Sequence, residues 1–365
     1  MVNKNKKMSK TVLKQALGID VSKDSLSMSL GVLRSDLSKD FMTREDVAND
    51  TDGFVILEKW LRKSSAEGTT PIIVLEATGV YHESIALYLH NLGYKVSVMQ
   101  SGRVKRYAQS LDQRSKTDAL DSRMLAMLGC ERSLDVWEPP SETMQELRAL
   151  SRERSILIRE RSIERNRIHA IEISTISNKG YIKRYKKRIS LLDKQIEEVK
   201  SEMLKIVGED EYLSTKMEYL VSIPGVSFIS AITVVAETYG FSLIKSGKQL
   251  VSYAGYDVVH RESGTYRGKT SISKKGNRHI RAVLHMPSMT CIRLNPTLKP
   301  FYNRLKPNKV KPLIALVAVQ RKMLILMYSL WKNEKYYDSE YEIKKAVKNK
   351  SFTAQDRCKL ELTTS

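Results

Sequence analysis

Four carboxylates in the first third of the chain have the types and spacing of a metal-binding site. Asp20 and Glu76 each end or directly follow an apolar run that predicts a strand. Asp118 and Asp121 stand three residues apart on a predicted helix, so both side chains lie on one face. Oxygen ligands suit Mg²⁺ or Mn²⁺ rather than zinc, and paired ions of that kind catalyse phosphoryl transfer. The order of these acids predicts a metal-dependent site for phosphoryl transfer.

Each of these acids also has an ordinary structural interpretation. An acid after a strand is a common turn former or helix cap, and paired acids on a helix usually face solvent. Asp24, Glu83 and Asp112 lie close to the four candidates in the sequence, so one of them could replace a candidate as a ligand. The prediction therefore rests on the combination of positions rather than on any single residue.

A second group of residues that could do chemistry centres on Ser263, in a segment rich in glycine, serine and basic residues. A serine held among arginines beside a phosphodiester can act as a nucleophile, while the arginines neutralise the developing charge. The alternative is a loop that grips phosphate and whose serine only donates a hydrogen bond. The basic residues expected to bind nucleic acid here are Arg261, Arg267, Lys269, Lys274, Lys275, Arg278 and Arg281.

The charge of the chain is uneven. Its 365 residues carry 62 Lys and Arg against 41 Asp and Glu, a formal charge of +21. Residues 263–333 hold fifteen Lys or Arg and no acid, whereas the other 294 residues hold 47 basic and 41 acidic groups. Such a concentrated excess predicts a polyanionic partner, most often nucleic acid. Three widely spaced cysteines exclude a disulfide scaffold and a thiolate zinc site.

The pattern of apolar residues divides the chain into regions. Residues 15–135 alternate short apolar runs with amphipathic stretches, which predicts a mixed α/β sheet. Residues 219–335 predict a mainly helical domain that contains Ser263, and the tails at 1–14 and 336–365 are expected to be flexible. In the first region we expect strands at 16–20, 26–33, 71–75 and 95–99, and helices at 51–62 and 81–92.

The middle region, residues 141–218, is nearly free of glycine and predicts two long helices. From Ile182 to Ile206, eight apolar residues follow one another at alternating spacings of three and four. This is the seam of a coiled coil, either folded back as a hairpin or paired with a second protomer.

No stretch of the sequence predicts a membrane span. The most apolar run, residues 313–319, is followed by the polar residues 320–322, and a span needs about 20 apolar residues. The lysine-rich N-terminus is not followed by the apolar segment of a secretory signal. We therefore expect a cytoplasmic protein.

Taken together, these residues resemble the DEDD-type transposases of bacterial insertion sequences, the IS one-ten and IS eleven-eleven group. The resemblance covers roughly residues 15–335, and the order of its motifs is more specific than any one of them. It rests on residues 18–23, 75–79, 116–121, 223–225 and 263–264, and on 272–277, Arg281, 296–302 and 315–324.

The resemblance implies a RuvC-like domain with a ribonuclease H fold over residues 15–135, in which Asp20, Glu76, Asp118 and Asp121 match the metal-binding acids. It implies a coiled coil used in dimerisation over residues 141–218. It also implies a C-terminal transposase domain, residues 219–335, in which Ser263 matches the serine that links covalently to DNA. Members of this family act as homo-oligomers on donor and target DNA, guided by a structured bridge RNA. The same partners, and an association with the bacterial nucleoid, are expected here.

The favoured hypothesis is a recombinase that moves an insertion sequence by cutting and rejoining DNA. One alternative is a metal-dependent junction resolvase that hydrolyses DNA without covalent serine chemistry. The other is a non-catalytic nucleic-acid-binding protein whose acids are structural.

Overall fold

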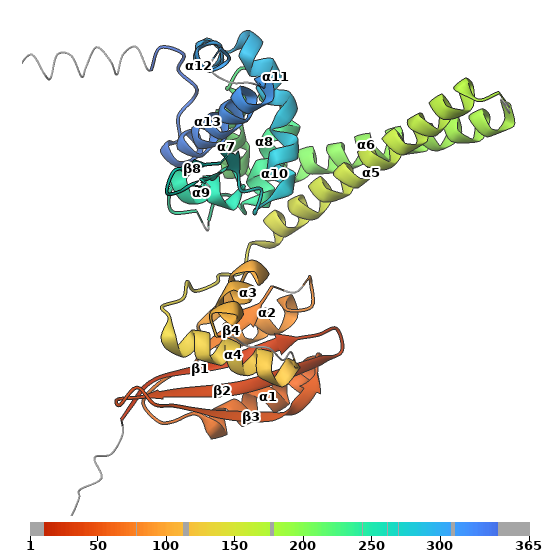
Figure 1. Cartoon of the computed structure of the whole chain (residues 1–365). Coiled ribbons are helices and arrows are strands. Elements are labelled where there is room, and N and C mark those ends of the chain that lie inside the picture. The colour runs from red at the N-terminus through yellow and green to blue at the C-terminus, as the bar shows by residue number, and fades with distance from the viewer. Residues whose placement is uncertain are drawn as a thin grey trace, which may run out of the picture. The chain divides into compact units, whose positions relative to one another are not determined.

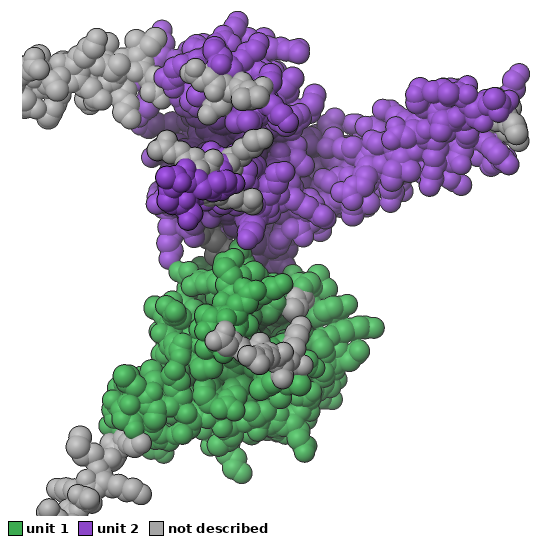
Figure 2. All heavy atoms as spheres, viewed as in Figure 1, with its two compact units in different colours: residues 1–139 green, residues 140–365 purple. Residues whose placement is uncertain are grey.

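The computed structural model describes residues 11–77, 79–111, 117–175, 179–242, 244–260, 262–268, 270–307 and 311–341. The chain divides into two compact units, Met1–Pro139 and Pro140–Ser365, which Figure 2 shows in separate colours. Each unit has hydrophobic core clusters of its own. The first unit corresponds to the predicted α/β region, and the second contains both the predicted long helices and the C-terminal region.

The first unit is built on a five-stranded sheet in the order β3-β2-β1-β4-β5. β1 pairs antiparallel with β2, which pairs antiparallel with β3. On its other side β1 pairs parallel with β4, which pairs parallel with β5. This is the mixed sheet that the sequence predicts. The strands are β1 (Val12–Val21), β2 (Ser25–Arg34), β3 (Lys39–Ala48), β4 (Ile72–Glu76) and β5 (Val96–Met99).

Helices cover both faces of this sheet (Figure 1). Leu17, Ile19 and Leu75 share a core with α1 and α2, while Val74 packs with α3 and α4. Successive strand residues point to opposite faces, so β1 and β4 are buried on both sides. The helices are α1 (Thr51–Ser64), α2 (Glu83–Asn91), α3 (Ser101–Ser110) and α4 (Asp118–Glu131).

The expected strands and helices of this region are present, but two elements were not predicted. β3 is a mostly exposed, charged edge strand, and α3 is a short helix with few apolar residues. The ordered structure also extends into both segments that were expected to be flexible tails, residues 1–14 and 336–365. β1 starts at Val12, and Tyr337 donates its backbone N–H to Ser222 at 2.9 Å. Residues 1–10 and 342–365 lie outside the described residues.

In the second unit, α5 (Glu142–Ile173) and α6 (Lys179–Glu209) lie side by side as a long hairpin (Figure 1). Ion pairs join Arg161 to Asp193 at 2.6 Å and Glu164 to Arg188 at 3.6 Å. Later positions on α5 therefore meet earlier positions on α6, and the two helices are antiparallel. The residues that α6 buries are Ile196, Val199, Met203 and Val207, which follow the predicted seam until Val207 replaces Ile206. The helices thus pair within one chain, and supercoiling stays a prediction.

Seven further helices of the described chain surround one core. This core runs from Leu147 and Met203 of the hairpin to Leu250 and Met327, so the hairpin and the C-terminal helices form one body. These helices are α7 (Glu211–Val221), α8 (Phe228–Glu237), α9 (Gly247–Tyr253), α10 (Arg278–Val283), α11 (His285–Leu294), α12 (Leu298–Leu305) and α13 (Pro312–Asn333).

Each unit buries one cysteine of the described chain, Cys130 on α4 and Cys291 on α11. Burial raises the pKa of each thiol to about 11. Cys291 donates its S–H to the Pro224 carbonyl at 3.1 Å. Next to it Gly225 has φ +98°, and a Cβ there would lie 2.9 Å from the Cys291 sulfur. The turn between α7 and α8 is therefore packed against α11.

α13 is 22 residues long and apolar enough to cross a membrane by length and composition, although the sequence predicts no span. Its residues Val319, Met323 and Met327 are fully buried in the core of the second unit. A core helix passes the same test, so this one helix does not indicate a membrane protein.

Candidate functional site

The sheet places two of the predicted carboxylates on neighbouring strands. β1 and β4 are parallel, and Ile19 lies opposite Leu75. Asp20 and Glu76 are the next residues on the two strands, so their backbones lie about 4.8 Å apart. Because side chains alternate between faces, both point to the side of the sheet that carries Val74 rather than Ile19. That is the side covered by α4, and both carboxylates are half-buried there.

A backbone contact fixes α4 against this face. A Cβ on Gly18 would lie 2.0 Å from the carbonyl oxygen of Ser122, so a side chain at this position would block the approach. One to two turns further along the helix, Gly129 lies against Ala16, where a Cβ would be 2.5 Å from the alanine methyl. α4 therefore runs antiparallel to β1. Its first turn lies at the end of β1 that carries Asp20.

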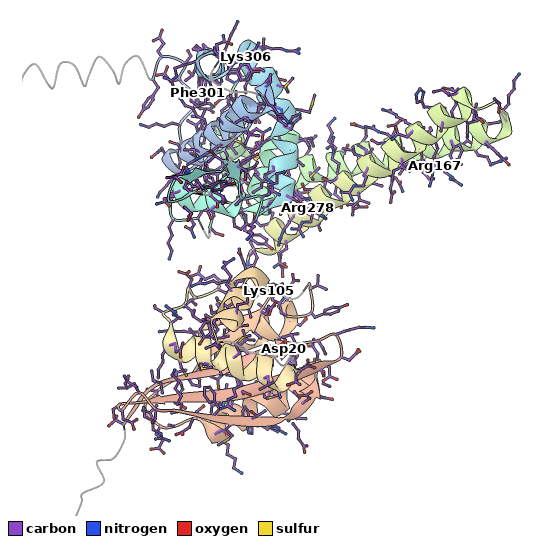
Figure 3. All side chains as sticks on the ribbon, viewed as in Figure 1. Asp20, Lys105, Arg167, Arg278, Phe301 and Lys306 are labelled. Atoms are coloured by element: carbon purple, nitrogen blue, oxygen red, sulfur yellow. The ribbon has the colours of Figure 1, made fainter. Side chains whose placement is uncertain are left out.

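The first turn of α4 carries the other two predicted carboxylates. Thr117 caps the helix, because its side chain accepts a hydrogen bond from the Leu120 amide. Asp118 is exposed and Asp121 is half-buried, and the partial positive charge of the helix start stabilises both. Strands and helix thus bring all four carboxylates to one end of one face of the sheet, where Figure 3 marks Asp20.

The four carboxylates have the oxygen donors of a Mg²⁺ or Mn²⁺ site, but they are not gathered around one point. Among the described residues, no three Asp, Glu, His or Cys side chains lie close enough to hold a metal ion. An ion held by all four would therefore require these side chains to turn toward each other. Of the alternative ligands, Asp24 and Glu83 are exposed, and Asp112 lies outside the described residues.

Ser263 lies near the tip of a narrow β-arm. It pairs with Tyr266 across a two-residue turn, in which Gly264 adopts φ +55°. A turn of this length needs positive φ, which glycine accepts without strain. Ser263 is exposed, so a phosphodiester can approach it. The arm consists of β6 (Val258–Val259) paired with β9 (Ser271–Ile272), and β7 (Glu262–Ser263) paired with β8 (Tyr266–Arg267).

The basic residues predicted around Ser263 have different environments. Lys274, Lys275 and Arg278 are exposed. Arg281 is half-buried and donates one guanidinium N–H to the Ala254 carbonyl at 2.7 Å. Arg281 therefore holds the base of the arm in place. Two of the predicted residues, Arg261 and Lys269, lie outside the described residues, and only the backbone of Arg267 is described.

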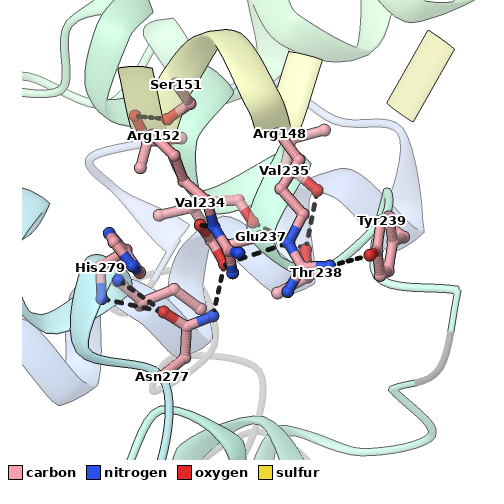
Figure 4. A network of polar contacts seen from close by, with 12 residues as sticks. Arg148, Ser151, Arg152, Val234, Val235, Glu237, Thr238, Tyr239, Asn277 and His279 are labelled. Atoms are coloured by element: carbon pink, nitrogen blue, oxygen red, sulfur yellow. Dashed lines mark hydrogen bonds and ion pairs between the residues drawn. The ribbon is translucent and has the colours of Figure 1, made fainter. Parts of the chain in front are cut away.

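A buried ionic network beside this arm was not predicted from the sequence (Figure 4). Glu237, at the end of α8, is fully buried and accepts two hydrogen bonds from Arg152, at 2.7 and 3.0 Å. Asn277 donates a third at 2.7 Å, and Arg148 lies 3.5 Å away. The same Asn277 side chain accepts from the amide of His279 and so caps α10. The network joins α5 and α8 to the segment that follows the arm.

The charges of this network determine the protonation of Glu237. Burial alone would raise the pKa of the carboxyl. The hydrogen bonds from Arg152 and Asn277, with the charge of Arg148, outweigh burial and lower the pKa below its ordinary value. The sequence does contain a signal for this network, namely a single acid, Glu237, at the end of the mostly apolar run 228–237. A charge buried with such a run requires partners.

Comparisons with known proteins show what this chain is similar to. A family model described as "Transposase" matches residues 17–171, and one described as "Transposase IS116/IS110/IS902 family" matches residues 217–303. Two proteins named pilin gene-inverting protein, from Moraxella lacunata and Moraxella bovis, are each 26% identical over 334 residues. These matches cover 91% of this chain and 98% of each relative. A transposase for insertion sequence element IS1328 from Yersinia enterocolitica is 25% identical over 58% of this chain and 68% of its own.

The mixed sheet, the helical C-terminal region and these matches define the class of protein. This class is the DNA transposases and recombinases, which are enzymes that act on DNA. The sheet is consistent with a ribonuclease H-like fold. The chain belongs to the IS110 family of insertion-sequence transposases.

Proposed function

We propose that this transposase cuts and rejoins DNA with two groups of its own residues. Asp20, Glu76, Asp118 and Asp121 hold one or two Mg²⁺ or Mn²⁺ ions, and Ser263 is the nucleophile. The observation that carries the proposal is the contact of α4 with β1 at Gly18, which puts two strand-end acids and two helix-start acids at one end of the sheet. Bound ions would stabilise the charge on the attacking and departing oxygens.

The proposed covalent step uses the exposed position of Ser263 on the arm. Its oxygen forms a bond to phosphorus while the bond from phosphorus to one sugar oxygen breaks. The serine proton leaves to water or to a carboxylate, and the departing oxygen takes up a proton. Exposed Lys274 and Lys275 would hold neighbouring phosphates by charge. Attack by another DNA hydroxyl on the phosphoserine would then rejoin the strands and release the serine.

The proposal includes the partners that the family resemblance implies. These are donor and target DNA, a structured bridge RNA, and further copies of the chain in a homo-oligomer, acting in the cytoplasm at the nucleoid. The acid-free segment 263–333, with its fifteen Lys or Arg, supports a nucleic-acid partner. Sequencing the RNA that co-purifies with the chain tests the guide, and random fragments would contradict it.

Inversion of a DNA segment is a second candidate outcome of the same chemistry. The Moraxella relatives are named pilin gene-inverting proteins and cover nearly the whole chain. Transposition and inversion both cut and rejoin DNA, and they differ in where the two sites lie. Mapping the product junctions formed on a plasmid that carries two sites separates the two.

Cleavage assays on the full chain test the proposed site. We expect Asp20→Asn and Asp118→Asn to lower strand cleavage by at least a hundredfold while DNA binding persists, since each removes a metal ligand. Asp52→Asn is the matched control, because Asp52 is also an exposed acid in the first turn of a helix of the same unit. Cleavage at normal rates by both test variants would refute the metal site.

The serine is tested by a protein–DNA adduct that survives denaturing electrophoresis. We expect the adduct with the wild-type chain and with Ser271→Ala, and none with Ser263→Ala. Ser271 is the control because it is an exposed serine of the same arm. Cleavage with no adduct in any variant would favour the metal-dependent resolvase, and DNA binding without cleavage would favour the non-catalytic alternative.

A further inference from the structure

The outer part of the α5–α6 hairpin carries a net positive charge, and the inner part does not. Residues 159–190 hold ten Lys or Arg and three acids. The division is sharpest on α6, where residues 179–190 hold six Lys or Arg and no acid, and residues 191–209 hold three Lys and five acids. Figure 3 marks Arg167 on the other helix of this hairpin. We call the described residues of 159–175 and 179–190 the outer hairpin.

The lysines of the outer hairpin gather on one face of α6. Lys179, Lys183, Lys186 and Lys187 line a shallow recess together with Ile182 and Ser190. All four lysines are exposed. Within the described residues, no carboxylate lies at ion-pair distance from any of the four. The recess therefore presents an uncompensated positive surface.

The inner part of the same helix shows the ordinary arrangement. Lys194 pairs with Glu198 at 3.5 Å, Lys200 with Glu197 at 2.9 Å, and Lys205 with Glu209 at 3.8 Å. Such pairs, three or four residues apart, stabilise a helix, whereas like charges at the same spacing destabilise it. Lys179 and Lys183, and Lys183 and Lys187, are like-charged neighbours of this kind. Helix stability alone would not favour this composition, which suggests an anionic partner.

We propose that the outer hairpin is a DNA-binding surface, separate from the arm of Ser263, that holds the phosphate backbone of duplex DNA without reading its sequence. Twelve residues of helix, 179–190, span about 18 Å, which matches about five phosphates along one strand. Lysines are point charges that neutralise phosphates and carry no base specificity. Exposed Tyr181, whose ring lies 4.8 Å from the Arg184 guanidinium, adds an aromatic contact for the sugar edge.

The occupant is assigned as DNA because the chain belongs to a class of enzymes that act on DNA. The surface does not depend on the proposed metal or serine chemistry. Its test therefore measures binding and not cleavage, and either proposal can fail while the other stands.

The experiment compares two triple variants of the full chain. One is Lys183→Gln, Lys186→Gln and Lys187→Gln, and its matched control is Lys194→Gln, Lys200→Gln and Lys205→Gln. Both remove three charges from the same helix. Affinity for a duplex without insertion-sequence ends, about 40 base pairs long, is measured by fluorescence anisotropy between about 50 and 200 mM salt. We expect the outer triple to lose about tenfold in affinity at 100 mM salt and to reduce the salt slope by about 2–3. The control should keep both values.

Further variants and ligands separate DNA binding at the outer hairpin from an effect of net charge and from a different occupant. A third variant that replaces the three outer lysines by arginine keeps the charge and should keep the affinity. Equal losses in the outer and inner triples would overturn the proposal, because net charge alone would then account for binding. Unchanged DNA affinity with weaker binding of a structured RNA, or with a smaller assembly by light scattering, would also overturn it in favour of RNA or a second copy.

Discussion

Among single residues, Glu237 is a buried charge whose partners join α5 and α8 to the segment before α10. It is fully buried and accepts hydrogen bonds from Arg152 and Asn277. Removing one partner of a buried ion pair leaves an uncompensated charge, which costs about 3–5 kcal/mol. The carboxylate therefore contributes to stability through its partners rather than through its own burial.

We expect Glu237→Gln to destabilise the second unit by about 3 kcal/mol, because the Arg148 and Arg152 guanidinium groups lose their shared anion. Denaturant unfolding at neutral pH measures the change. The control is Glu198→Gln, an exposed residue whose ion pair with Lys194 should contribute less than about 0.5 kcal/mol. Equal effects of the two substitutions would contradict the role of the network.

The same residue gives the stability a pH dependence with a definite sign. The pKa of Glu237 is lowered in the folded chain, so the unfolded chain binds the proton more readily. Its contribution is therefore present above the ordinary value near 4.5 and is lost as pH falls through the folded pKa. The stability difference between wild type and Glu237→Gln should shrink below pH 4.5. A difference that grew on acidification would contradict the lowered pKa.

Among the elements, α4 positions half of the proposed metal site through a contact in which no side chain takes part. Gly18 lets the helix approach β1 until the Ser122 carbonyl lies where a Cβ would be. The register of Asp118 and Asp121 against Asp20 therefore depends on glycine at this position.

We expect Gly18→Ala to destabilise the first unit by about 3 kcal/mol, since backbone atoms of α4 cannot move aside as a flexible side chain can. The matched control is Gly208→Ala on α6, where nothing lies within 4 Å of the new methyl group. That substitution should stabilise its helix by about 0.5–1 kcal/mol. Thermal unfolding of both variants measures the shifts, and a neutral Gly18→Ala would mean that α4 can slide on the sheet.

The elements that the sequence predicted are those whose apolar residues face a core. β1 and β4 appear as apolar runs because helices cover both faces of the sheet, and β2 appears as alternating apolar residues, of which Leu26, Met28 and Leu30 face one core. β3 was missed because its residues are charged and exposed, and pairing with β2 is what makes it a strand. The close approach of α4 to β1 could not be predicted either. A glycine such as Gly18 or Gly129 indicates that another segment packs close to it, but not which segment.

Of the candidate site, the sequence predicted which acids end strands and which lie on one face of a helix, but not that the helix begins at Asp118. It did not predict the Glu237 network, whose partners Arg152 and Asn277 lie far apart in the chain. It assigned Arg281 to nucleic acid, but it did not predict that one guanidinium nitrogen of Arg281 donates to the Ala254 carbonyl. A long side chain has many partners within reach, and only the fold decides among them.

Over the whole molecule, the two units have separate cores and should fold separately. We expect residues 1–139, expressed alone, to unfold cooperatively with a midpoint close to one transition of the full chain, because no core cluster of the described residues spans both units. Circular dichroism and calorimetry measure this. Gly18→Ala in the full chain should shift that transition and leave the other in place. A fragment without cooperative unfolding would show that the units stabilise each other.

Over the whole molecule, the positive charge is concentrated in shorter segments than the composition of the predicted regions indicates. The segment 263–333 holds fifteen Lys or Arg, but the outer hairpin contributes a second excess that averaging over 141–218 conceals. The folded hairpin separates the lysines of 179–190 from the acids of 191–209 along one helix axis.

The two buried cysteines make the motions of each unit separately observable. Cys130 belongs to the first unit and Cys291 to the second, and burial raises the pKa of both thiols to about 11. A thiol reagent therefore reacts only when a unit opens, so its labelling rate reports local unfolding. Replacing Cys358, which lies outside the described residues, by serine leaves one thiol per unit. Mass spectrometry of the labelled chain would then show which unit opens first when DNA binds.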